Sequence, residues 1–194
     1  MKNKKEIYLP ETSEIEGLYK KARYRKNFAD KLRSTVFMLI VVAAFAVLVA
    51  MLFLPILRIY GKSMKGTLDS GDIVVTVKSN QLNTGDIVAF YYNNNILVKR
   101  VIAKSGDWVN MTEDGTVYVN DKKLDEPYLT SKAYGETNIT FPYQVPENRI
   151  FVMGDNREVS IDSRNTSVGT VSDEQIVGKL VFRIWPLSDI GFIE

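Results

Sequence analysis

The feature that most constrains this 194-residue chain is an uncharged apolar run near its N-terminal end. No charged residue lies between Arg33 and Arg58, which leaves 24 residues, 34–57, without charge. A helix of that length reaches about 36 Å, and the hydrocarbon core of a bilayer is about 30 Å thick. Buried core helices rarely run so far without a charge, and the apolar part of a cleavable leader is usually shorter. The sequence therefore predicts one retained transmembrane helix over 34–57.

Basic residues are concentrated before this run. Seven lie within residues 20–33, directly before it, namely Lys20, Lys21, Arg23, Arg25, Lys26, Lys31 and Arg33. Only Arg58, Lys62 and Lys65 follow it closely. Because the more basic flank of a span stays in the cytoplasm, residues 1–33 are expected inside and residues 58–194 outside a cell membrane crossed once. The stretch 18–32 fits either a short amphipathic helix on anionic lipid or a solvated basic tail.

The chain contains neither cysteine nor histidine. Disulfides, thiolate catalysis, a Ser–His–Asp triad and His- or Cys-ligated zinc are therefore excluded. If the protein is a hydrolase, its general base must be Lys, Asp, Glu or Tyr. The net charge of +2 gives no argument for nucleic-acid binding. We expect no metal and no cofactor.

Residues 58–194 have the pattern of a mainly β domain. Short runs rich in Val, Ile, Tyr and Phe alternate with turn residues. Asn93-Asn94-Asn95, Asp114-Gly115 and Asn120-Asp121 predict turns, and Asp114-Gly115 is a strong hairpin signal. An extended loop is expected over 130–146 and a short helix over 172–176. The expected strands are 72–78, 86–92, 96–104, 108–111, 116–120, 149–153 and 178–185. We expect an antiparallel sheet or barrel-like domain.

A serine between two glycines lies just after the predicted span. Gly61 and Gly66 flank Ser63 at −2 and +3. Such spacing permits a strained turn with an exposed backbone N–H, which suits a nucleophile whose own amide binds an oxyanion. Glycine-flanked serines are also common in ordinary loops, so this signal alone leaves both interpretations open.

A lysine lies inside the predicted strand 96–104. Strand alternation puts Leu97, Lys99, Val101 and Ala103 on one face, and Ile96, Val98, Arg100 and Ile102 on the other. Both faces are largely apolar, so burial would lower the pKa of Lys99 and let its neutral amine accept a serine proton. The alternative is a lysine that reaches solvent or pairs with a carboxylate.

A polar loop follows the predicted strand 149–153. It contains Gly154-Asp155-Asn156-Arg157, and Ser160, Asp162 and Arg164 lie shortly after. Ion pairs between these acids and bases can tie loops together, and Ser160 can direct an amine through a hydrogen bond. An ordinary structural loop is the alternative.

Taken together, these segments resemble those of the type I signal peptidases, and the Gram-positive branch of that family in particular. The stretch Ser63–Leu68 is similar to the family's nucleophile box. The pairs Gly71-Asp72 and Gly85-Asp86 are similar to its next box, and Lys99-Arg100-Val101 to its lysine box. The polar loop 154–164 is similar to its last box. The boxes occur in the family's order, from the apolar run to the C-terminus.

The resemblance implies a membrane-anchored serine endopeptidase that cleaves signal peptides from exported preproteins at the outer face of the membrane. It implies Ser63 as nucleophile, Lys99 as general base and Ser160 as the residue that orients Lys99. The loop residues Asp155, Arg157, Asp162 and Arg164 would support the site. Pockets for small residues at −1 and −3 of the substrate would be lined by Met64, Leu68, Leu97 and Val98.

Two positions depart from the family's pattern. Some members have a hydroxyl residue two positions before the nucleophile as an oxyanion donor, and here that position is Gly61. The family usually has Pro where this chain has Gly66, which predicts a looser turn after Ser63.

The expected partners are preproteins, membrane lipid and the export translocon. Two other functions stay open at this point. One is a different Ser–Lys processing protease, such as a self-cleaving repressor or a conjugation-pilin processor. The other is a catalytically silent, membrane-anchored β-domain that binds exported proteins.

Overall fold

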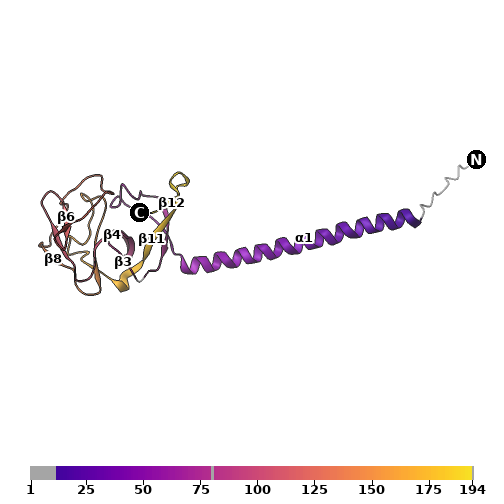
Figure 1. The fold of residues 1–194 in the computed structure, drawn as a ribbon, viewed down its shortest axis with the longest axis horizontal. Helices are drawn as coiled ribbons and strands as arrows, with labels where there is room; N and C mark the ends of the chain where they lie inside the picture. Colours follow the sequence, from indigo (N-terminus) through magenta and orange to yellow (C-terminus); the bar gives the residue numbers. More distant parts are fainter. Residues whose placement is uncertain (1–11, 80, 194) are drawn as a thin grey trace, which may run out of the picture. The chain divides into compact units, whose positions relative to one another are not determined.

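The computed structural model describes residues 12–79 and 81–193, and the chain divides into two compact units between Ala50 and Met51. The helix α1 (Thr12–Phe53) dominates the first unit (Figure 1). It runs without a break through the basic stretch 18–32, which is therefore helical, and its described side chains are exposed. Within the described residues it is the one helix long and apolar enough to cross a bilayer.

The helix ends four residues earlier than the sequence analysis predicted. It stops at Phe53, and Ile56–Arg58 form the first strand, β1. Pro55 explains the difference, because proline disfavours the helical conformation of the residue before it and has no N–H to donate. β1 pairs antiparallel with β2, so that Leu57 lies opposite Val74.

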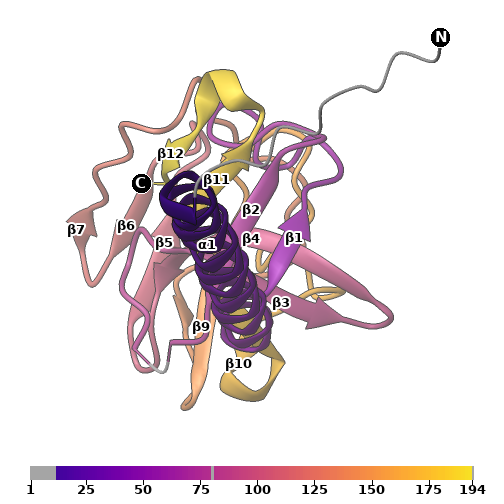
Figure 2. The ribbon, with the colours of Figure 1, turned by 90° about the vertical axis from the view of Figure 1, so that its right-hand side faces the viewer.

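The second unit consists of two antiparallel sheets. The larger has the order β1-β2-β11-β3-β4-β9-β10, with β12 paired to β11. Besides β1, its strands are β2 (Ile73–Val77), β3 (Ile87–Tyr92), β4 (Asn95–Ala103), β9 (Arg149–Met153), β10 (Val171–Ser172), β11 (Ile176–Trp185) and β12 (Gly191–Phe192). The smaller sheet has the order β7-β6-β5-β8. Its strands are β5 (Trp108–Met111), β6 (Val117–Val119), β7 (Lys122–Lys123) and β8 (Tyr143–Gln144). In Figure 2, β6 and β7 lie at the opposite side of this unit from β1.

The mainly β, antiparallel prediction is confirmed. All seven expected strands are present, and each of their ends lies within two residues of the predicted one. The strands missed by the sequence analysis, β1, β7, β8, β10 and β12, have only two or three residues each, too few to show a period. β8 lies inside the expected loop 130–146, and the expected short helix is the three-residue 3₁₀ turn Asp173–Gln175. A second 3₁₀ turn spans Leu187–Asp189.

Asparagine-rich turns connect the strands where the sequence predicted them. Tyr92 pairs with Asn95, which leaves Asn93 and Asn94 as a two-residue turn between β3 and β4. Between β6 and β7, Asn120 and Asp121 have φ values of 49° and 64°. Two consecutive positive φ values are what a tight hairpin turn of type I′ requires. The β3–β4 hairpin fixes the register that places Lys99 opposite Val88.

The strict alternation predicted along 96–104 fails at its end. A register shift between β4 and β9 falls between Val101 and Ala103, and Ile102 and Ala103 then enter the same hydrophobic cluster. A bulge of this kind adds a residue to one strand and turns both neighbours toward one side. Up to Val101 the alternation holds, so that Lys99 and Arg100 point to opposite faces of the sheet.

Candidate active site

Ser63 lies in a tight turn between β1 and β2. The backbone N–H of Lys65 donates to Lys62 O (3.2 Å), and that of Leu68 donates to Met64 O (2.8 Å). Met64 and Leu68 are buried in one hydrophobic cluster, which fixes the turn on the sheet. Ser63 itself is half-buried, so its hydroxyl is held in place and still accessible.

The two glycines beside Ser63 have positive φ values, 95° at Gly61 and 108° at Gly66. Glycine adopts this region without steric cost. A side chain at Gly61 would meet open space, so the turn has no side-chain donor there. The ring of proline fixes φ near −65°. Gly66 therefore has a backbone conformation that proline cannot adopt, and the looser turn expected from the sequence stays a prediction.

Lys99 extends from β4 to the Ser63 turn. Its Nζ lies 2.7 Å from Ser63 Oγ, to which it donates a hydrogen bond. The side chain is buried, with 3 % of the residue exposed. β4 is an inner strand between β3 and β9, and Val88 of β3 lies directly opposite Lys99. Burial on an inner strand holds the amine at the hydroxyl and keeps it from bulk water.

Burial lowers the pKa of the Lys99 amine from 10.5 to about 8. Removal of the charged form from water is the largest cause. The carboxylate of Asp162 opposes it, the Arg164 guanidinium adds to it, and Asp155 has a smaller raising effect. A substantial fraction of the amine is therefore neutral near physiological pH. In that state it can accept the proton of Ser63 across the same 2.7 Å contact.

The loop after β9 docks on the Ser63 turn through Asn156. The backbone N–H of Asn156 donates to Ser63 O (2.9 Å), and its side-chain Nδ2 donates to Lys62 O (3.1 Å). The same residue accepts a hydrogen bond from Ser160 N (3.1 Å). Three segments far apart in sequence, namely the Ser63 turn, β4 and this loop, are thereby joined at one place.

Ser160 is fully buried at the centre of this loop. Its Oγ has no hydrogen-bond partner within the described part of the chain. A Cβ built on Gly154 would lie 2.2 Å from Ser160 Oγ and 2.5 Å from Ser63 O. Ser160 therefore packs against the backbone between the loop and the Ser63 turn. Its expected role in orienting Lys99 stays a prediction.

Asp162 and Arg164 form a buried ion pair at the base of the loop. Arg164 Nε donates to Asp162 Oδ1 (2.8 Å) and Nη2 donates to Oδ2 (2.9 Å), and neither side chain is exposed. Asp162 Oδ2 also accepts a hydrogen bond from Gly154 N (3.0 Å). Arg164 Nη2 donates to Ser160 O (3.2 Å). The pair satisfies buried backbone groups on both sides of the loop and fixes its shape.

Asp155 joins the loop to the opposite face of β4. Arg100 donates to it twice, from Nε to Oδ1 (3.0 Å) and from Nη2 to Oδ2 (2.8 Å). Thr67 Oγ1 donates to Asp155 Oδ2 (2.5 Å). Arg100 Nη1 donates to Gly85 O (2.8 Å). The Gly85 carbonyl and the Thr67 hydroxyl therefore both contact the Arg100–Asp155 ion pair.

Comparison with known proteins gives the family of this chain. The family model for signal peptidases, peptidase S26, matches residues 32–185. The chain belongs to this family. It is 40 % identical over 154 residues to signal peptidase IB of Staphylococcus aureus (strain MRSA252), covering 69 % of this chain and 79 % of the relative.

A more distant relative and a solved structure also match. The thylakoidal processing peptidase 1 of Arabidopsis thaliana chloroplasts is 37 % identical over 171 residues, covering 77 % of this chain and 48 % of the relative. The crystal structure of a signal peptidase I from Enterococcus faecalis V583 is 32 % identical, with a TM-score of 0.45. It covers 52 % of this chain and 97 % of that chain. Membership in the signal peptidase family makes the chain a peptidase, which confirms the expected enzyme class.

A cleft of about 630 Å³ opens beside Ser63 in this signal peptidase family member. It lies between residues 57–61, which continue β1, and residues 94–98 at the start of β4. Three of the expected pocket residues, Met64, Leu97 and Val98, line it. The fourth, Leu68, does not line it and is buried with Met64 in the adjacent core.

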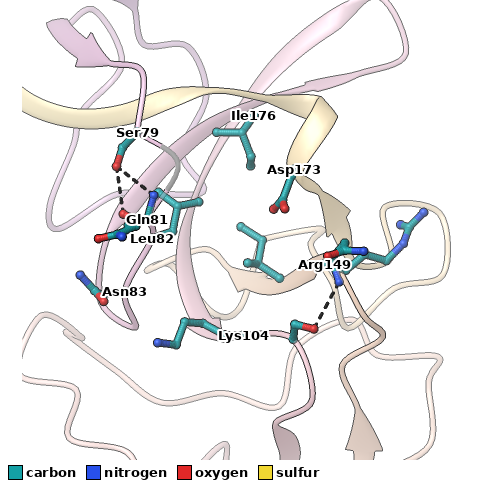
Figure 3. Close-up of a pocket in the computed structure, with 11 residues that line it drawn as sticks. Ser79, Gln81, Leu82, Asn83, Lys104, Arg149, Asp173 and Ile176 are labelled. Carbon is teal, nitrogen blue, oxygen red and sulfur yellow. Dashed lines mark hydrogen bonds between the residues drawn. The ribbon is translucent and has the colours of Figure 1, made fainter.

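A second cavity, of about 640 Å³, lies elsewhere in the second unit. Figure 3 shows Lys104, Asp173 and Ile176 around it. Neither Ser63 nor Lys99 is among its lining residues, most of which are exposed. It is therefore not part of the signal peptidase site.

The sequence analysis missed several residues of the site. Asn156 and Thr67 hold the Ser63 turn, and Glu126 forms a buried ion pair with Arg157. Tyr128 lies under the Arg100 guanidinium, 3.9 Å from ring centroid to Cζ. Asn156 and Thr67 lie within the recognised boxes. Glu126 and Tyr128 lie in a stretch without periodicity, and nothing in the sequence marked them.

Proposed function

We propose that this protein is a signal peptidase I that removes signal peptides from exported preproteins. Ser63 is its nucleophile and Lys99 its general base. The 2.7 Å contact between a buried amine of lowered pKa and the Ser63 hydroxyl carries the proposal. Family membership supplies the reaction, and the absence of histidine from the chain leaves lysine as the suitable base.

The reaction proceeds through an acyl-enzyme. Neutral Lys99 accepts the Ser63 proton as Ser63 Oγ attacks the scissile carbonyl carbon. The Ser63 amide stabilises the resulting oxyanion, because Gly61 offers no side-chain donor. The ammonium of Lys99 then protonates the leaving amine as the peptide bond breaks. Lys99 next takes a proton from water, which attacks the ester and releases the signal peptide, and the proton returns to Ser63.

The cleft beside Ser63 accounts for substrate binding. The edge residues 57–61 and 94–98 offer backbone groups to an extended peptide, which would bind as an added strand. Met64, Leu97 and Val98 would bound shallow pockets for small residues at −1 and −3. These pockets leave room for small side chains next to the nucleophile.

Residues 1–33 lie in the cytoplasm in this proposal, the apolar part of α1, residues 34–53, crosses the membrane, and the β-strands of the second unit lie outside. The excess of basic residues before the span supports this orientation. A preprotein that leaves the export translocon is already in the membrane. Anchoring this protein in the same membrane would raise the effective concentration of the preprotein at Ser63.

The proposal is tested with the purified full chain in detergent and a preprotein substrate. Ser63→Ala and Lys99→Ala should each lower cleavage by about 10⁴-fold or more, with unchanged circular dichroism. Ser188→Ala and Lys104→Ala, at exposed positions, are matched controls and should cleave normally. Near-normal turnover by either site variant would overturn the assignment.

The orientation has its own test. Because the chain has no cysteine, one introduced at exposed Lys132 is unique. A membrane-impermeant maleimide should label it in intact cells. Labelling only after lysis would contradict an outer catalytic domain.

A further inference from the structure

Four buried charged groups, two of them within the 154–160 loop, take no part in the proposed proton transfer. They are Arg100, Asp155, Glu126 and Arg157, and each side chain is at most 2 % exposed. Arg100 pairs with Asp155, and Arg157 pairs with Glu126. Two cations and two anions make the cluster formally neutral, which is the arrangement that buried charges require.

Tyr128 joins the two ion pairs. The Arg100 guanidinium stacks on its ring, 3.9 Å from the centroid, and its hydroxyl donates to Glu126 Oε1 (3.2 Å). Burial, and then the Glu126 carboxylate, raise the pKa of the Tyr128 hydroxyl. The phenol therefore stays neutral and remains a donor at physiological pH.

Within the 154–160 loop, the cluster contacts Gly154. Arg157 Nε donates to Gly154 O (3.1 Å). No space is left around Gly154, since a Cβ there would lie 2.2 Å from Ser160 Oγ and 2.5 Å from Ser63 O. A shift of Arg157 would therefore be passed directly to Ser160 and Ser63. On the other side, Asp155 connects Arg100 to Thr67 in the Ser63 turn.

Glu126 and Tyr128 come from a different part of the unit than the catalytic residues. They lie between β7 and β8 of the smaller sheet, whereas Lys99 and Gly154 belong to β4 and to the end of β9 in the larger one. Glu126 Oε2 and Arg157 Nη1 have no partner in the described residues, so each charge depends on the other. Residues 126–128 thus contact Arg157 and Arg100 from outside the 154–160 loop and β4.

We propose that Glu126 and Tyr128 are positioning residues, which hold Arg157 and Arg100 so that the 154–160 loop stays packed against the Ser63 turn. The inference rests on the proposed function of Ser63 and Lys99 and adds to it two residues that touch neither substrate nor the reacting atoms. Loss of either residue should let the loop move away from Lys99.

Tyr128→Leu removes the ring without changing any charge. Because burial is the main cause of the lowered Lys99 pKa, a looser loop should raise that pKa from about 8 toward 10.5. We expect kcat for preprotein cleavage at pH 7 to fall about tenfold or more, KM to stay within about twofold, and the midpoint of the pH–rate profile to move upward. Tyr128→Phe keeps the ring and should change kcat less than about threefold. The exposed Tyr91→Leu should match wild type.

A merely structural role would reduce the amount of active enzyme and leave the pH midpoint unchanged. That result for Tyr128→Leu would overturn the proposal, as would wild-type kcat. The midpoint is therefore measured on the folded fraction of each variant, after size-exclusion chromatography.

Glu126→Gln, Arg157→Gln and the double variant test whether Glu126 acts through Arg157. Residues that act as one unit give non-additive losses. The double variant should lose no more kcat than Arg157→Gln alone, and the exposed Glu136→Gln should cleave normally. Losses that multiply in the double variant would contradict the proposal. If Glu126→Gln does not fold, the Tyr128 variants decide the question.

A readout without substrate separates this inference from the proposed function. The Lys99 ε-carbon can be titrated by NMR in the detergent-solubilised chain and assigned by its absence in Lys99→Met. A raised Lys99 pKa in Tyr128→Leu supports the inference even if the wild-type chain cleaves no preprotein. An unmoved pKa in a chain that does cleave would overturn this inference alone.

Discussion

Lys99 Nζ contacts Ser63 Oγ at 2.7 Å, although 36 positions separate the two residues in sequence. The contact distinguishes between the interpretations that the sequence left open for this lysine. Lys99 does not reach solvent, since only 3 % of it is exposed. No carboxylate forms an ion pair with Lys99 within the described residues. The two nearby aspartates, Asp155 and Asp162, pair with Arg100 and Arg164 instead. The amine is directed at the hydroxyl.

Cleavage should rise with pH as Lys99 loses its proton. In the proposed mechanism the neutral amine is the active form, and a pKa of about 8 leaves roughly a tenth of it neutral at pH 7 and half at pH 8. The rate should therefore increase about tenfold per pH unit below pH 7 and level off above pH 9. Measurement of kcat/KM from pH 5 to 10 checks this, and a flat profile would argue against Lys99 as base.

Lys99→Arg should abolish activity while preserving charge. A guanidinium stays protonated at any pH the protein tolerates, so it cannot accept the Ser63 proton. We expect a loss of about 10³-fold or more with no recovery up to pH 10. Lys104→Arg, at an exposed position directly after the same strand, is the matched control and should behave as wild type.

Gly154→Ala should disturb the site through one methyl group. Its Cβ would overlap Ser160 Oγ and Ser63 O, both backed by buried structure. Overpacking of this kind costs about 1–3 kcal/mol of unfolding free energy, and kcat should fall at least tenfold. Gly191→Ala meets open space and should stay within about 0.5 kcal/mol of wild type. Urea unfolding followed by tryptophan fluorescence measures the stability of both variants. Equal free energies of unfolding would contradict the close contact of Gly154 with Ser160 and Ser63.

Asp162→Asn should destabilise the second unit strongly. It leaves the fully buried Arg164 guanidinium without its counter-charge, which typically costs about 3–5 kcal/mol. Lys179→Met removes one partner of a more exposed pair, with 33 % of the Lys179 side chain exposed, and should cost less than about 1 kcal/mol. Denaturant titration of both variants gives the comparison, and similar losses would contradict a special role for the buried pair.

The longer strands were predictable because alternation over four or more residues leaves a visible pattern. Two- and three-residue strands such as β7 and β10 leave none, since their pairing is decided by neighbours that the sequence does not show. The family resemblance implied that Leu68 lines the substrate pocket. The turn places it in the core instead, where Met64 packs on it.

By itself, the sequence determined the apolar helix, the antiparallel β class and the chemistry available, because charge-free length, alternation and the absence of histidine are properties of the chain. It also supplied the Ser63 and Lys99 candidates. Only the tertiary structure decided that they meet, since a hydrogen bond between β4 and a distant turn depends on sheet register and loop docking. The same reason explains Glu126 and Tyr128, whose contacts with Arg157 and Arg100 exist only after the two sheets have packed.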